Sequence, residues 1–146
     1  MRVFDKNENF LIAVRNLLIQ CGLNPINIEA DHVLLFCEMS PANELIGIIG
    51  LEIYETSALL RSLAVRDTQR RQGLAHSLLN EAIHFANQNS IIDLFLLTET
   101  IEQMMKQQYG FRLASKDLVP VDMIESPFFH GICPSTCQIM FKSLNR

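Results

Sequence analysis

The residues best suited to hold a ligand form one short run, Arg70-Arg71-Gln72-Gly73-Leu74-Ala75, between a strand-like segment and a helical one. The first N–H groups of a helix have no intrahelical partner, and the helix dipole is positive at that end. Gly73 has no side chain, so the backbone can approach a ligand closely, and the small side chain of Ala75 leaves room beside it. Arg70 and Arg71 add charge-assisted donors suited to phosphate. The run therefore predicts a phosphate or pyrophosphate site, the alternative being an exposed, arginine-rich helix start.

The distribution of charge supports one small anion site and argues against nucleic acid. The 146-residue chain has a formal net charge of −4, and no Lys or Arg occurs between Asn16 and Leu60. Four arginines then follow within a short stretch, at positions 61, 66, 70 and 71. Binding to a phosphate backbone needs an extended basic face, so we expect no nucleic-acid partner. The stretch without basic residues would instead favour an approaching ammonium substrate.

The apolar pattern predicts the elements that position this run. Extended apolar runs predict strands at 32–39, 44–54, 57–65, 91–97, 111–115 and 136–144, with a short strand at 1–4. Apolar residues three or four apart predict helices at 7–21, from 73 to the polar cluster 87–89, and at 101–108, with a short helix within 120–134. Thr100 and Gln103 are spaced as a capping box for the third helix, and Gly110 ends it.

The order of these elements predicts an α/β fold with a mixed sheet. The strands at 32–39, 44–54 and 57–65 have short connections and should be antiparallel neighbours. A helix then separates strand 57–65 from strand 91–97, which implies a right-handed crossover and a parallel pair. Residues 1–146 contain no repeat or linker, so we expect a single domain.

Cysteine usage and hydropathy predict a cytoplasmic protein. The four cysteines show no regular disulfide framework, and no apolar signal segment follows Met1. No apolar run approaches the ~20 residues that a membrane span requires. We therefore expect reduced thiols and no membrane association.

At the ligand-binding run the sequence resembles the GNAT superfamily of acetyl-CoA-dependent N-acetyltransferases. The family's pyrophosphate loop has the form Gln/Arg-x-x-Gly-x-Gly/Ala, matched here by Arg70, Gly73 and Ala75. The run Leu60–Val65 is similar to the family's preceding strand, and Tyr109–Arg112 to the end of its next helix. The resemblance covers nearly the whole chain. It implies a GNAT fold, with a mostly antiparallel sheet whose parallel pair splays into a V-shaped cleft.

The resemblance also implies how the cosubstrate acetyl-CoA would bind. The pantetheine arm would bond main chain in the strand at 57–65, and the pyrophosphate would sit on the loop. We expect no metal. The residues that this implies for CoA binding are Leu63, Ala64, Val65, Arg70, Arg71, Gln72, Gly73, Leu74, Ala75, His76 and Lys106.

A narrower resemblance is to a GNAT group encoded with arsenic-resistance genes. It is carried by Ala58–Val65, Leu96–Thr98, Glu125–Phe128 and Cys133–Ser135. The run Arg-Ser-Leu-Ala-Val within the first segment is also similar to the acetyltransferase domain of N-acetylglutamate synthases. Both similarities imply a small amine acceptor, such as an amino acid or a toxic amino-acid analogue.

N-acetyl transfer needs a proton acceptor for the attacking ammonium, and two carboxylates are candidates. Strand alternation places Glu52 on one face with Gly50 and Tyr54, so Glu52 is the first candidate if that face lines the cleft. The alternative is a strand carboxylate that faces solvent. Glu99, at the end of strand 91–97, is the reserve candidate, with the plainer role of favouring the next helix N-terminus.

The sequence departs from the family pattern at the proton donor for the leaving thiolate. Many relatives use a Tyr four residues before the Gly-Phe pair, and Lys106 holds that place here. Tyr109 stands directly before Gly110 and is the nearest hydroxyl candidate. Lys106 would then stabilise the thiolate, contact a CoA phosphate or face solvent.

Arg61 and His130 are the candidates for binding the acceptor. A guanidinium on a central strand is costly to bury unless a carboxylate meets it. Arg61 should therefore contact either a substrate carboxylate or one of Glu52 and Glu55. His130, in the segment before Cys133, could reach the acceptor pocket or lie exposed.

The remaining alternatives concern the thiols and the assembly. Cys133 and Cys137 could bind a metal or arsenite, although free thiols are the simpler expectation. A non-catalytic CoA-binding module and a thiol-based metalloid binder are therefore the competing functions. A homodimer completed by the last strand or by residues 120–134 stays open.

Overall fold

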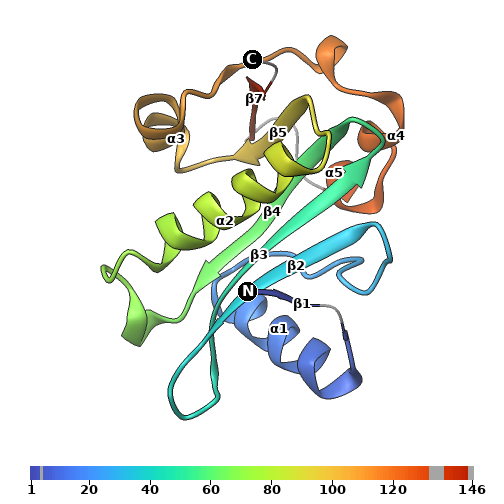
Figure 1. Cartoon of the computed structure of the whole chain (residues 1–146). Helices are drawn as coiled ribbons and strands as arrows, with labels where there is room; N and C mark the ends of the chain where they lie inside the picture. Colours follow the sequence, from blue (N-terminus) through green and yellow to red (C-terminus); the bar gives the residue numbers. More distant parts are fainter. Residues whose placement is uncertain (4, 132–136, 145–146) are drawn as a thin grey trace.

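The computed structural model describes residues 1–3, 5–131 and 137–144. Their strands form one sheet of seven, in the order β1-β2-β3-β4-β5-β7-β6 (Figure 1). The pair β4–β5 is parallel and the other pairs are antiparallel, which confirms the predicted mixed sheet. The strands are β1 (Arg2–Val3), β2 (Val33–Met39), β3 (Leu45–Tyr54), β4 (Ser57–Val65), β5 (Asp93–Thr98), β6 (Arg112–Leu113) and β7 (Gln138–Ser143).

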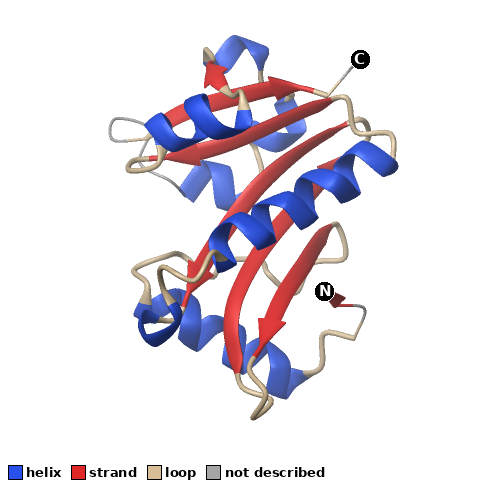
Figure 2. Cartoon of the chain, turned by 60° about the vertical axis from the view of Figure 1, so that its left-hand side comes forward, coloured by secondary structure: helices blue, strands red, loops and turns tan. Residues whose placement is uncertain are grey.

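Helices cover both faces of the sheet (Figures 1 and 2). Neighbouring residues Leu59 and Leu60 of β4, and Phe95 and Leu96 of β5, belong to different apolar clusters, so these two central strands are buried on both sides. Helices α2 and α3 pack on one face, while α1 and the pair α4–α5 pack on the other. The helices are α1 (Glu8–Gln20), α2 (Leu74–Gln88), α3 (Glu102–Tyr109), α4 (Val121–Ile124) and α5 (Pro127–Gly131), and two 3-10 turns are η1 (Asp67–Gln69) and η2 (Lys116–Leu118). None of the helices in the described ranges is long and apolar enough to cross a membrane.

The predicted elements are present, with corrections at their ends. Segment 120–134 holds two short helices up to Gly131, and the strand predicted at 111–115 is reduced to β6. The predicted capping box of α3 is wrong. The N-cap is Ile101, and the Thr98 hydroxyl instead accepts hydrogen bonds from the backbone N–H groups of Thr100 (3.1 Å) and Ile101 (2.9 Å). The last residue of β5 thus sets the start of α3.

The parallel strands separate beyond their midpoint. Pairing of β4 with β5 ends at Leu60 and Leu96. Beyond that point β4 stays paired only with β3, and β5 stays paired with β7 as far as Thr98. The register of β3 and β4 also shifts there, and Ser62 adopts a left-handed φ of 61°. The predicted splay is therefore present, and it opens the sheet between its two halves (Figure 2).

Candidate active site

A cleft of about 560 Å³ lies where β4 and β5 separate. Strand β4 lines it with Leu60, Arg61, Ser62 and Leu63, and the end of β5 with Leu96, Leu97 and Thr98, followed by Glu99. Phe128 of α5 and Cys137, just before β7, complete the wall on the far side. The cleft thus joins chain segments that are distant in the sequence.

The start of α2 forms an open cradle for an anion. Gly73 is the N-cap, with a φ of 78° that side chains rarely adopt, and a Cβ at this position would meet no atom within 4 Å. The first helical hydrogen bond runs from Ser77 N–H to the Gly73 carbonyl (3.0 Å), so the N–H groups of residues 74–76 precede the helical ladder. No acidic residue stands in this first turn. Arg71, also left-handed with a φ of 68°, is exposed beside it.

Arg70 braces the loop that leads into this cradle. Its Nε donates to the carbonyl of Val65 (3.2 Å), and its Nη2 lies 3.0 Å from Oδ1 of Asp67 and 3.6 Å from Sγ of Cys21. Leu63 lines the cleft, whereas the backbone of Ala64 pairs with β3. The remaining predicted CoA contacts of the loop are an exposed Gln72 and the half-buried first-turn residues Leu74, Ala75 and His76.

A buried ion pair lies at one wall of the cleft, which Arg61 lines. Nη1 of Arg61 lies 2.7 Å from Oε2 of Glu52, and neither side chain is more than 1% exposed. The Tyr54 hydroxyl donates to Oε1 of Glu52 (2.5 Å). The guanidinium also donates to the Ser62 hydroxyl (2.8 Å) and stacks 4.0 Å above the ring of Phe128.

This ion pair bears on two expectations, the exposure of Glu52 and the partner of Arg61. Glu52 is not a solvent-facing carboxylate, because it is completely buried. Arg61 meets Glu52, which was one of the two predicted internal partners, whereas Glu55 is exposed in the turn between β3 and β4. Strand alternation holds as predicted, since Leu51 faces the α2 side and Glu52 the opposite side with Tyr54.

Burial shifts the proton affinities of the groups around this pair. It lowers the pKa of Arg61, and the neighbouring Glu52 carboxylate opposes that change. Burial and the hydrogen bond to Glu52 raise the pKa of Tyr54, so its hydroxyl stays a donor at neutral pH. The pair is therefore a fixed, charge-compensated unit.

The three predicted catalytic residues lie in different places. Glu99 is exposed and lines the cleft, where the Cys137 thiol donates to its Oε1 (3.7 Å). Glu52 and Tyr109 are not among the described residues that line the cleft. The Tyr109 hydroxyl lies 2.7 Å from Nδ1 of His76, with the two rings stacked at 5.8 Å, and burial raises the pKa of Tyr109.

Two further predicted site residues, Lys106 and His130, are not among the described residues that line the cleft. The ammonium of Lys106 pairs with Glu102 (2.8 Å) one helical turn earlier and is exposed. His130 is exposed and lines a smaller pocket beside the cleft. Sequence reasoning missed Tyr54 as a partner of Glu52, although their shared strand face was a usable signal. The sequence contains no signal that the ring of Phe128 would pack against the guanidinium of Arg61.

The described residues show no grouping that would favour a metal. Cys21 and Cys37 are free thiols, and Cys133 lies outside the described residues. Among the residues described, no three His, Cys, Asp or Glu side chains come together as metal ligands would.

Diverging parallel strands, followed along the chain by an open helix N-terminus, form an α/β geometry that suits a ligand carrying a phosphate. The sequence profile of the acetyltransferase (GNAT) family matches residues 8–111, so this chain belongs to that family. It is therefore a GNAT-type acetyltransferase, and acetyl-CoA is the acetyl donor of that family. A comparison with curated proteins found no match.

Solved structures agree on the fold. N-acetylglutamate synthase from Neisseria gonorrhoeae, complexed with coenzyme A and N-acetyl-glutamate, has a TM-score of 0.78 at 17% identity, over 100% of this chain and 35% of that one. A GNAT-family acetyltransferase from Staphylococcus aureus has a TM-score of 0.73 at 14% identity, over 99% of both chains. The ribosomal-protein-S18-alanine N-acetyltransferase of Escherichia coli has a TM-score of 0.72 at 16% identity, over 100% of this chain and 96% of that one. At these identities the likeness concerns the fold alone.

Proposed function

We propose that this chain transfers the acetyl group of acetyl-CoA to the primary amine of a small molecule, such as an amino acid or an amino-acid analogue. The observation that carries the proposal is the separation of β4 and β5, which leaves Leu63 and Glu99 facing one cleft. The open cradle at Gly73 stands at the start of the helix that follows β4.

The cradle supports a role in holding the pyrophosphate of CoA. Backbone N–H groups of residues 74–76 and the exposed Arg71 offer donors and positive charge to an anion. The open space at the Gly73 Cβ position leaves room for a phosphate to approach the backbone. In this arrangement Arg70 acts mainly as the brace of the loop, and the edge of β4 from Leu63 to Val65 receives the pantetheine arm.

Glu99 is our choice for the proton acceptor. It is exposed in the cleft, whereas Glu52 already compensates Arg61 and accepts from Tyr54. The ammonium of the acceptor would give one proton to Glu99. The neutral nitrogen would then form a bond to the thioester carbonyl carbon as the carbon–sulfur bond breaks, releasing the CoA thiolate. The nitrogen gives its second proton to water, and the thiolate takes a proton from water.

Tyr109 and Lys106 support the cosubstrate side rather than the reacting atoms in this proposal. Tyr109 is engaged with His76 in the first turn of α2, and Lys106 with Glu102. A free thiol has a pKa of about 8.5, so a thiolate is a stable leaving group near neutral pH and water can supply its proton.

Arg61 lines the acceptor end of the cleft, so it is placed to contact the acceptor. Because Glu52 compensates its charge, Arg61 offers hydrogen bonds there and little net positive potential. The free thiols of Cys21 and Cys37 support a reducing compartment such as the cytoplasm.

The experiment that tests the proposal measures binding and turnover separately. Calorimetry should show acetyl-CoA binding, and a thiol assay should show CoA release with at least one class in a panel of amines. The panel contains amino acids, glufosinate-like and arsinothricin-like analogues, alkylamines and arylmethylamines. Binding with no release above background for every amine would replace the enzyme by a CoA-binding module, and failure to bind acetyl-CoA would overturn the site.

A further inference from the structure

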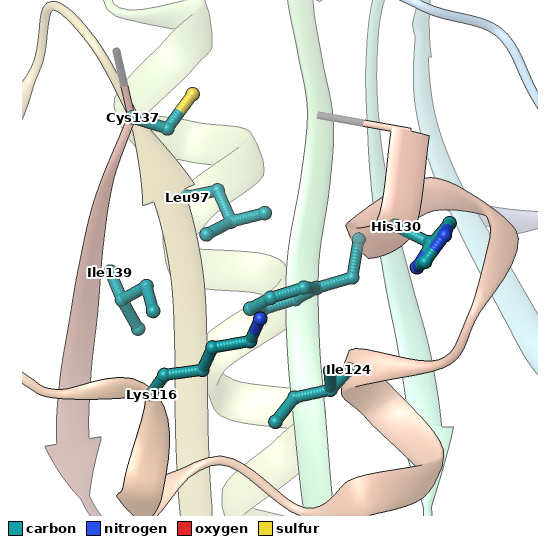
Figure 3. A pocket seen from close by; sticks show the side chains of 7 residues that line it. Leu97, Lys116, Ile124, His130, Cys137 and Ile139 are labelled. Carbon is teal, nitrogen blue, oxygen red and sulfur yellow. The ribbon is translucent and has the colours of Figure 1, made fainter. Parts of the chain in front are cut away.

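A second pocket lies directly beside the cleft (Figure 3). It has a volume of about 180 Å³, and Leu97 and Cys137 line both this pocket and the cleft. The side chains of Leu97 and Cys137 therefore form the boundary between the two. A molecule lying across that boundary would have one end near Glu99 and the other end in the pocket.

The walls of this pocket are mostly apolar. Ile124 of α4, Phe129 of α5 and Ile139 of β7 line it together with Leu97. A closed apolar cavity of about 150 Å³ is large enough for a benzene-sized molecule. The pocket thus fits a short aliphatic or aromatic group and offers it little hydrogen bonding.

Lys116, in η2, provides a positive charge at this pocket. Figure 3 shows its side chain reaching across the pocket, with the ammonium end between Ile124 and Leu97. Among the lysines and arginines of the described chain, only Arg71 and Lys116 make no ion pair, hydrogen bond or ring contact with a described residue. Arg71 stands at the cradle. Lys116 thus resembles Arg71 in being a cation without a protein anion beside a ligand-sized opening.

We infer that the acceptor is a primary amine on an apolar body of about benzene size that ends in a carboxylate or a similar anion. This inference rests on the transferase function proposed above. The amine lies beside Glu99, the body crosses Leu97 and Cys137 into the pocket, and the anion meets Lys116. Arg61 cannot replace Lys116 in this role, because Glu52 already compensates its charge.

A matched series of three amines tests the anion contact. The series is 4-(aminomethyl)benzoate, 4-(aminomethyl)benzamide and benzylamine, which share one reacting group and one ring. The wild type should prefer the carboxylate by about tenfold in kcat/KM, the range of a charge-assisted contact at a partly exposed site. Lys116→Met should remove that preference and leave benzylamine unchanged. Arg15→Gln, a surface cation on α1 paired with Glu8 and Glu29, is the control for net charge and should keep the preference.

The apolar body is tested by filling the pocket. Ile124→Phe should raise KM for all three ring amines several-fold and leave methylamine unaffected, since methylamine is too short to reach the pocket. Equal kcat/KM for all three ring amines in the wild type, or an unchanged preference in Lys116→Met, would overturn the inference while the transferase function stands.

A probe without an amine separates this inference from the proposed function. Binding of 4-methylbenzoate, followed by NMR, does not require catalysis. Binding to the wild type and not to Lys116→Met would support the anion pocket even if no amine is acetylated. No binding to the wild type would overturn the pocket, whatever the outcome of the turnover assays.

Discussion

The two sides of the cleft are built by different means. The side that we propose for the cosubstrate comes from one stretch of chain, from the end of β4 to the first turn of α2, and presents backbone N–H groups around Gly73. The side that we propose for the acceptor combines side chains of β3, β4 and α5 around the Glu52–Arg61 pair. A backbone site needs only the right local conformation, whereas a side-chain site needs long-range packing and charge compensation.

The difference predicts where each side is vulnerable. On the cosubstrate side, one residue sets the backbone path, so most side-chain changes should be mild. On the acceptor side, each member of the ion pair depends on the other, because an unpaired buried charge is costly. Substitutions on the two sides should therefore affect different quantities, ligand affinity in one case and folding stability or turnover in the other.

The largest effect is expected from Glu52→Gln, which leaves the Arg61 charge uncompensated. The free energy of unfolding should fall by about 3–5 kcal/mol, measured by urea denaturation. Glu44→Gln is the matched control, because it breaks an exposed pair with Arg66 (3.0 Å) and should cost less than about 1 kcal/mol. The double variant Glu52→Leu/Arg61→Met should recover much of the loss. Equal losses of unfolding free energy in Glu52→Gln and Glu44→Gln would mean that the buried pair matters no more to stability than an exposed one.

Glu99→Gln tests the chemistry of the acceptor side without removing a buried charge. Because Glu99 is exposed, we expect normal stability and normal acetyl-CoA affinity with a fall in kcat of about 1000-fold, within the range of general-base catalysis. Glu55→Gln, in the turn between β3 and β4, should keep full turnover. A Glu99→Gln enzyme as active as the wild type would return the role of base to Glu52.

The same contrast explains how much of the molecule could be predicted from its sequence. The cradle could be predicted because Gly73 and the run around it are contiguous, and the apolar periods of β4 and α2 fix the junction. The order of the elements and the parallel pair followed from the chain alone. Local rules therefore sufficed for the fold and for the backbone conformation of the cradle.

The acceptor side required distances that the sequence does not contain. Strand alternation placed Glu52 on the face of Tyr54, but it could not show that α5 would cover this face with Phe128 and bury the pair. The prediction of the N-cap of α3 failed for a related reason. Thr98 is the last residue of β5, and its hydroxyl reaches forward to the helix start because the strand ends there.

Gly73→Asp tests whether the cradle binds the pyrophosphate of acetyl-CoA. The left-handed φ of 78° disfavours a side chain, and a carboxylate would repel the pyrophosphate. We expect acetyl-CoA affinity to fall about 100-fold by calorimetry, the size of two lost charge-assisted contacts. Gly73→Asn is the control, because Asn tolerates this conformation and is neutral, so its loss should stay below about tenfold. If the Asp and Asn variants bind equally, charge at the cradle does not matter.

The smallest effect is expected from Tyr109→Phe, which tests whether Tyr109 supports acetyl-CoA binding or takes part in the reaction. The change removes the hydroxyl that holds His76 in the first turn of α2 and keeps the stacked ring. One net hydrogen bond is worth about 0.5–1.5 kcal/mol, so we expect acetyl-CoA to bind about threefold more weakly while kcat is unchanged. His76→Phe should reproduce this pattern, because it deletes the same bond from the other partner. If Tyr109→Phe instead lowers kcat about 100-fold with affinity intact, Tyr109 is the proton donor to the thiolate, and the cosubstrate side contributes a side chain to the reaction as well as backbone.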